Sequence, residues 1–168
     1  HVIRSKPTGE WGGKLVGTFA QDSQQDLKGL INFPEIGGLS VKLSASSIQG
    51  GEYIDNPSRG TTDGENDLFM MSFDAIFAPS DTFDFRLIYD YIDNETPTRP
   101  VTALTAPGEA FGAFCGDNCA SGKTSDALYR TFTTQEQYAA MRTDSITIHA
   151  NWQFADDHKL ALIFGDRQ

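Results

Sequence analysis

Residues 83–92 read FDFRLIYDYI, and every second side chain in this stretch is aromatic or large and apolar. The side chains between them are mostly charged. Because side chains in a β-strand point alternately to opposite faces of a sheet, this period of two predicts a strand with one apolar and one polar face. The residues that share the apolar face are Phe83, Phe85, Leu87, Tyr89 and Tyr91. Residues 39–46, LSVKLSAS, repeat the pattern, so we expect an all-β chain.

Seven stretches carry strand signals, most of them about 9 to 11 residues long, which is the length that crosses a bilayer as a tilted strand. They are 12–21, 25–33, 39–49, 67–77, 83–92, 144–154 and 159–166. The short turns 34–38, 78–82 and 155–158 alternate with the connection 22–24 and the long connections 50–66 and 93–143. Strands joined in this way predict an antiparallel up-and-down sheet, with short turns at one end and long loops at the other.

Aromatic side chains gather near both ends of the predicted strands, on the apolar face. The set at the short-turn end is Trp11, Phe33, Phe77, Phe83, Trp152 and Phe154, and the set at the long-loop end is Phe19, Phe69, Tyr89 and Tyr91. Aliphatic side chains such as Leu15, Leu43 and Ile148 lie between the two sets. Two aromatic belts around an aliphatic band are typical of a transmembrane β-barrel. A sandwich core with scattered aromatic residues is the alternative.

The opposite face of the predicted sheet is polar. Its members include Lys42, Asp74, Arg86, Asp90 and His149. In a barrel these side chains would face the lumen and whatever fills it, and on a sandwich they would face water. Closed single-chain barrels of bacteria have an even number of strands, and an open edge in lipid leaves backbone groups unsatisfied. Seven strands therefore mean either that the strand count is wrong or that the chain is one piece of a longer barrel, and we favour the second interpretation.

The charge and hydropathy of the sequence limit the classes of protein to which the chain can belong and the partners that it can bind. The chain has 168 residues and a net charge of -10, which argues against a nucleic-acid partner because phosphate contacts need a basic surface. No window approaches 18 consecutive apolar residues, so we expect no transmembrane helix. The mean hydropathy of -0.36 still allows barrel strands, in which only every second residue faces lipid. Residues 1–4, HVIR, carry no signal peptide, so for an exported protein we expect the start of the gene product to lie upstream.

The long connection 93–143 holds the candidate ligand-binding side chains. They are Arg99, Tyr129, Arg130 and Tyr138, chosen because they suit a polar or anionic ligand at an outward loop. The alternative is that they only pack the loop. Thr133 and Glu136 have the spacing of a capping box, which predicts a short helix over 135–142.

Cys115 and Cys119 lie in the same connection. A small disulfide in an oxidising compartment is favoured over two free thiols. No second Cys or His pair stands nearby, so no zinc site is expected. No nucleophile, base and orienting group converge in the sequence, and we expect neither an enzyme nor a bound cofactor or metal.

Four stretches resemble a TonB-dependent outer-membrane receptor. They are VIRSKPT at 2–8, which is similar to the join between plug and barrel, and GGKL at 12–15, LSVKLS at 39–44 and FDFRL at 83–87, which resemble early barrel strands. The resemblance implies a barrel of about 22 strands with a plug in its lumen. Residues 1–11 would then be the plug-to-barrel linker and residues 12–168 the first part of the barrel.

The same resemblance implies TonB-dependent uptake of a scarce nutrient, such as an iron-siderophore, across the bacterial outer membrane. The implied partners are outer-membrane lipid and lipopolysaccharide, a small-molecule or metal-chelate ligand, and TonB. TonB would bind an N-terminal region that this sequence does not contain. The sequence also lacks a plug and the later barrel strands, so their ligand contacts are not carried over to this chain.

Two other classes of protein stay open. A secreted, soluble β-sandwich that binds glycans through aromatic faces predicts that Phe73, Leu87 and Ile148 are buried within one chain. A passive porin shares the barrel, but it predicts a constriction loop and no upstream plug.

Overall fold

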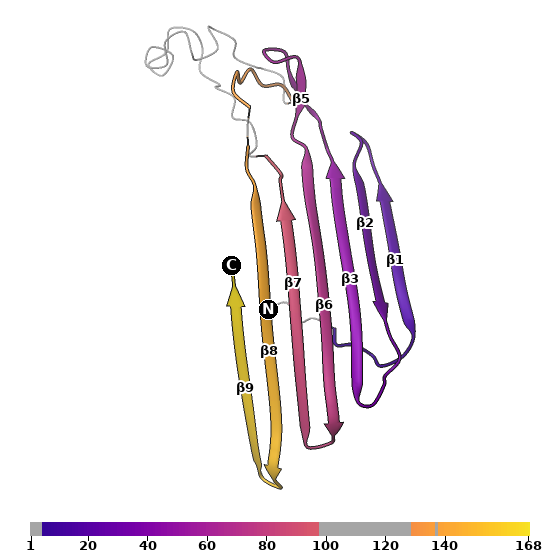
Figure 1. The fold of residues 1–168 in the computed structure, drawn as a ribbon. Coiled ribbons are helices and arrows are strands. Elements are labelled where there is room, and N and C mark those ends of the chain that lie inside the picture. The colour runs from indigo at the N-terminus through magenta and orange to yellow at the C-terminus, as the bar shows by residue number, and fades with distance from the viewer. Residues whose placement is uncertain (1–4, 98–128, 137) are drawn as a thin grey trace.

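The structure is a computed structural model that describes residues 5–97, 129–136 and 138–168. This part of the chain is all-β, with one seven-stranded antiparallel sheet and one two-stranded hairpin (Figure 1). Along the sheet the strands are β1 (Gly12–Phe19), β2 (Gln25–Asn32), β3 (Leu39–Gly50), β6 (Asn66–Ser80), β7 (Phe83–Asn94), β8 (Met141–Ala155) and β9 (His158–Arg167). Within the described residues, no helix is long and apolar enough to cross a membrane.

All seven predicted strands are present, and each sheet strand pairs with the next sheet strand in the sequence. The observed strands differ from the predicted ones mainly in length. Both β6 and β8 are longer than predicted, with 15 residues each. The ladder between β7 and β8 continues until Asn94 lies opposite Met141, so backbone pairing extends β8 beyond the predicted bounds 144–154. β1 is shorter than predicted and ends at Phe19, before the turn that leads into β2.

The sheet is open. Among the described residues, β1 pairs only with β2 and β9 pairs only with β8, so neither edge closes onto the other. The structure thus has the up-and-down order expected of a barrel wall without the closure of a barrel.

The connection 50–66 contains a hairpin that was not predicted. Its strands are β4 (Ile54–Asn56) and β5 (Thr61–Asp63), and they project beyond the long-loop end of the sheet (Figure 1).

The helix predicted over 135–142 was wrong. The described residues of 131–140 are not helical, and Met141 and Arg142 already belong to β8. The hydroxyl oxygen of Thr133, which would have capped this helix, instead accepts a hydrogen bond from the side-chain amide of Asn56 at 3.2 Å.

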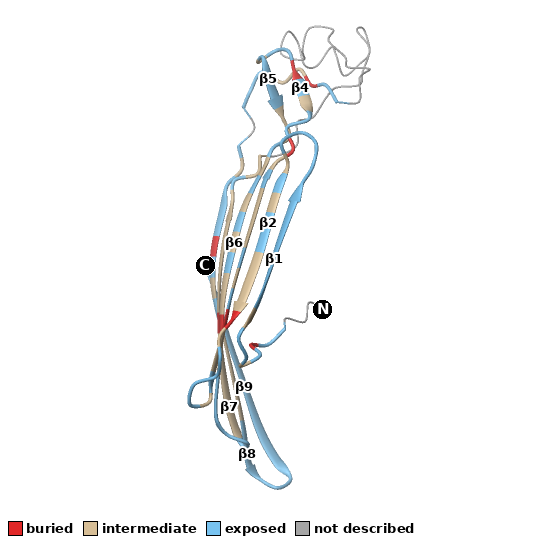
Figure 2. Cartoon of the chain, turned by 90° about the vertical axis from the view of Figure 1, so that its right-hand side faces the viewer, coloured by how far each residue is buried: buried red, intermediate tan, exposed pale blue. Residues whose placement is uncertain are grey.

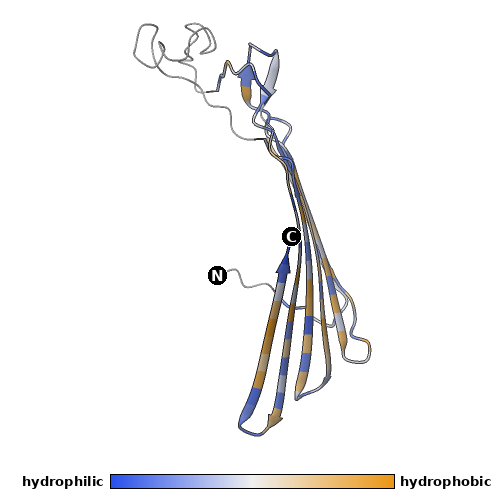
Figure 3. Ribbon diagram, turned by 60° about the vertical axis from the view of Figure 1, so that its left-hand side comes forward, coloured by the Kyte–Doolittle hydropathy of each residue, from blue (hydrophilic) through white to orange (hydrophobic). Residues whose placement is uncertain are grey.

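Burial in the sheet is the reverse of that in a soluble protein. The five buried residues of the seven-stranded sheet all lie on its polar face, and they are Asn32, Lys42, Asp74, Ile88 and Thr143 (Figure 2). Large side chains of the other face are exposed, among them Leu15, Leu43, Phe77, Leu162 and Phe164. Hydrophobic and hydrophilic residues alternate along the strands (Figure 3). The sheet's large apolar residues therefore do not form a core within the described chain.

Candidate functional site

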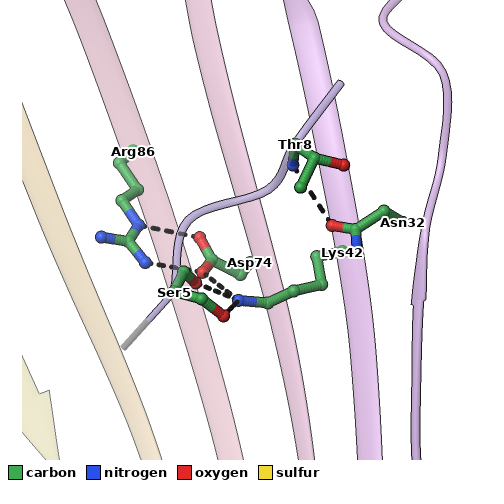
Figure 4. A network of polar contacts seen from close by, with 6 residues as sticks. All are labelled: Ser5, Thr8, Asn32, Lys42, Asp74 and Arg86. Atoms are coloured by element: carbon green, nitrogen blue, oxygen red, sulfur yellow. Dashed lines mark hydrogen bonds and ion pairs between the residues drawn. The ribbon is translucent and has the colours of Figure 1, made fainter. Parts of the chain in front are cut away.

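An ion-pair triad lies on the polar face of the sheet, where β3, β6 and β7 run side by side (Figure 4). Asp74 lies opposite Lys42 in the β3–β6 register, and Lys42 Nζ lies 3.3 Å from Asp74 Oδ2. Arg86, on β7, donates to both carboxylate oxygens, from Nε to Oδ1 at 2.9 Å and from Nη2 to Oδ2 at 2.7 Å. The exposed fractions of the side chains are 10% for Lys42, 2% for Asp74 and 13% for Arg86. The carboxylate thus holds two cations in a site largely removed from water.

Residues 5–9, which we call the strap, lie against the same face beside the triad (Figure 4). Lys42 Nζ donates a hydrogen bond to the backbone carbonyl of Ser5. The backbone N–H of Thr8 donates to Asn32 Oδ1 at 3.2 Å. Further along, the N–H of Glu35 donates to the carbonyl of Gly9 at 2.8 Å. The strap is therefore fixed to β2, to β3 and to the turn between them before the chain enters β1.

A hollow of about 340 Å³ opens next to the triad and the strap. Part of its lining is polar, and these residues are Ser5, Lys42, Ser44, Ser46, Ser72, Asp74 and Asp90. The rest of its lining is formed by Leu30, Ala45, Met70, Met71, Tyr91 and Ile92. The hydroxyl oxygen of Ser46 is buried and has no hydrogen-bond partner within the part of the chain that the structure describes. Small hydroxyl side chains leave space above the strands, and this space could receive a further polar segment or group.

The structure brings the predicted polar-face residues onto one face but not into one cluster. Lys42, Asp74 and Arg86 form the triad, and Asp90 lines the hollow opposite Ser72 in the register. His149 lies opposite Arg86 in the β7–β8 register and is half-buried. That this face lines a lumen stays a prediction.

The predicted loop residues are divided between two places. Tyr129 and Arg130 lie beside β4, where Arg130 Nε donates to Asp55 Oδ2 at 3.0 Å. The ring of Tyr129 meets that of Tyr53 edge to face, with 5.8 Å between centroids. Tyr138 is 78% exposed and lines a separate hollow with several carboxylates. Arg99, Cys115 and Cys119 lie outside the described residues, so their predicted ligand and disulfide roles stay predictions.

At the long-loop end of the apolar face, tyrosine hydroxyls are held by carboxylates. Tyr89 donates to Asp144, and Tyr91 donates to Asp93 Oδ2 at 2.9 Å. Arg142 binds the same oxygen of Asp93 from Nη2 at 2.8 Å. These rings are thus anchored at their polar ends, which is the arrangement that amphipathic aromatic residues adopt at a boundary between apolar and wet surroundings.

Sequence reasoning missed the strap contacts of Ser5, Thr8 and Asn32, and the buried residues Asn56 and Thr131. Asn32 had one usable signal, because it is a polar residue at the end of a strand on the face that also carries Lys42. The contact of Ser5 had none, since it joins residues 37 positions apart.

In the described part of the chain, no group of three or more His, Cys, Asp or Glu side chains is arranged to hold a metal ion. Comparison with known proteins finds no family model, no curated protein and no solved structure that matches this chain.

Proposed function

We propose that this chain is part of the barrel wall of a TonB-dependent outer-membrane receptor, which takes up a scarce nutrient such as an iron-siderophore. The apolar face would contact lipid, and the polar face would line the lumen. One observation carries the proposal. The buried residues of the sheet lie on its polar face, while Leu43, Phe77 and many other large apolar side chains on the opposite face are exposed.

The exposed apolar face supports a lipid partner. Soluble monomers rarely expose contiguous apolar patches larger than about 300–600 Å². Here exposed large side chains occur on every strand of the sheet except β7, from Leu15 on β1 to Phe164 on β9. Aromatic residues lie toward both ends of this face, with Phe69 and Tyr91 in ring contact at one end and Trp152 and Phe154 in contact at the other. Such belts sit at the two interfaces of a membrane barrel.

The polar face supports a filled lumen. The triad places one carboxylate between two cations, and the strap reaches β1 from that side of the sheet (Figure 4). A chain that passes from a plug into the first barrel strand would follow this path. The open edges of β1 and β9 also favour a larger barrel, because unpaired strand edges are costly in lipid.

The alternatives fit less well. The sandwich predicts that Phe73, Leu87 and Ile148 are buried, but each of them is only half-buried. A passive porin fits the two faces equally well, yet it gives no reason for a strap fixed to the triad.

Cell fractionation and uptake test the proposal on the intact protein that carries this sequence. We expect a band in the outer membrane whose gel mobility changes on boiling, together with uptake of an iron chelate that stops when a protonophore removes the energy source. Uptake that continues without energy would indicate a porin. A soluble protein of unchanged mobility would overturn the membrane assignment and favour the sandwich.

A further inference from the structure

Two loops that leave different hairpins of the sheet meet in one folded unit, which we call the clasp. It consists of β4, β5 and residues 129–133. Asp55 on β4 is the meeting point, because its N–H donates to the carbonyl of Tyr129 and its carbonyl accepts from the N–H of Thr131, each at 2.9 Å. Residues 129–131 thus pair with β4 through a single parallel β-bridge between Asp55 and Arg130. The ion pair of Asp55 and Arg130 lies at the same point.

Asn56 ties all three segments of the clasp together. Its side chain is fully buried. Its amide nitrogen lies 2.8 Å from Asp63 Oδ2 on β5, 3.0 Å from the carbonyl oxygen of Thr133 and 3.2 Å from the Thr133 hydroxyl oxygen. These polar contacts of Asn56 thus join the hairpin to residues 129–133.

The closed clasp also contains two buried polar atoms that have no hydrogen-bond partner among the described residues. They are the Asn56 side-chain oxygen and the Thr131 hydroxyl oxygen, and both residues are 0% exposed. Water would bind both atoms if the segments separated. Burying a polar group without a partner is unfavourable, so these atoms oppose closure while the bonds of Asp55 and Asn56 favour it. The stability of the closed clasp is the difference between these two sets of terms.

We propose that the clasp is a releasable closure at the long-loop end of the sheet. The β4–β5 hairpin and residues 129–133 part and rejoin without unfolding of the seven-stranded sheet. The free energy needed to open the clasp is then low compared with the free energy of unfolding the whole protein, as is usual for loops that admit ligands. The assignment of opening to ligand entry rests on the proposed function, whereas the opening itself does not.

Hydrogen exchange measures the opening directly in the intact protein, because the N–H groups of Asp55 and Thr131 donate across the clasp, to the carbonyls of Tyr129 and Asp55. Thr131→Val keeps the shape of the side chain and removes one unpartnered hydroxyl. We expect this variant to slow exchange at both amides by roughly tenfold. The matched control is Thr18→Val, which changes an exposed residue of β1 outside the clasp and should leave exchange at both amides unaltered. Asn56→Ala should speed exchange at both amides and leave β6 and β7 protected.

Two results would overturn the clasp. One is equal exchange at these amides in Thr131→Val and Thr18→Val. The other is exchange at Asp55 and Thr131 that occurs only when β6 and β7 also exchange, since opening would then be global unfolding.

A cross-link tests the opening of the clasp independently of the proposed function. Asp55→Cys with Arg130→Cys, with Cys115 and Cys119 changed to Ser, should form a disulfide because the two positions are bridge partners. We expect locked protein to lose exchange at the clasp and to lose iron-chelate uptake, both restored by a reductant. Failure of the disulfide to form counts against the clasp. Disulfide formation with unchanged uptake supports the clasp and counts against ligand entry at this point.

Discussion

Lys42 and Asp74 lie opposite each other on β3 and β6, with Nζ and Oδ2 3.3 Å apart, and both are almost completely buried. One position along the same two strands, Leu43 lies opposite Phe73 on the other face. Leu43 is exposed and Phe73 is half-buried. Two neighbouring residue pairs of the β3–β6 ladder thus bury charged side chains on one face and leave apolar side chains accessible on the other. This distribution of burial is unfavourable in water, and it is favourable when lipid covers the apolar face and protein covers the polar one.

Removing the carboxylate of the triad should be far more harmful than removing one of its cations. Asp74→Ala leaves Lys42 and Arg86 close together and buried without a counter-ion, so we expect a loss of about 3–5 kcal/mol in the free energy of unfolding. Lys42→Met leaves Asp74 with both bonds from Arg86, and we expect a loss below about 1.5 kcal/mol. Urea unfolding of the intact protein in detergent measures both. Equal losses would contradict the triad.

The cost of a charge on the apolar face should depend on depth rather than on exposure. Leu43 lies near the middle of β3 and Leu39 at its short-turn end, yet their exposed fractions are similar, 39% and 42%. In a membrane, Leu43→Arg should cost about 2–4 kcal/mol and Leu39→Arg about 0–1 kcal/mol. On a water-facing sheet both changes would fall within about 0.5 kcal/mol of zero. The unfolding free energies of the two variants therefore decide between lipid and water.

A glycine controls the packing of the β1–β2 turn against the end of β3. Gly50 has a φ of +91°, and a Cβ atom there would lie 2.2 Å from the carbonyl oxygen of Ser23. Gly50→Ala should destabilise the protein by about 3 kcal/mol or more, through backbone strain and the displaced turn. Gly60→Ala is the control, because its φ is +68° and its Cβ would meet nothing, so about 1–2 kcal/mol is expected. Thermal unfolding checks both, and similar losses would refute the packing.

The strands could be predicted because their signal is local. Period-two alternation placed Leu43 and Lys42 on opposite faces, and the structure confirms both the faces and the order of all seven sheet strands. The early start of β8 was not predictable in this way, since Met141 is in a strand only because Asn94 lies opposite to it.

The candidate site was predictable only in part. The period-two pattern placed Lys42, Asp74 and Arg86 on the polar face, but it did not indicate which of them would pair. The structure brings them together in the triad. The capping box at Thr133 indicated a helix, but a side chain 77 residues away takes the Thr133 oxygen atoms. Local propensity is a weak guide where a tertiary contact competes for the same group.

Labels at two adjacent residues of β3 test directly whether the apolar face of the sheet contacts lipid. Spin labels are placed on single cysteines at Leu43 or Ser44 in the intact protein in a lipid bilayer, with Cys115 and Cys119 replaced by Ser. We expect the label at 43 to collide with oxygen dissolved in lipid and to be shielded from a water-soluble nickel chelate. The label at 44 should show lower oxygen accessibility, because its face lines the polar interior. Equal access of the nickel chelate to both labels, or higher oxygen access at 44 than at 43, would contradict a lipid-facing apolar sheet.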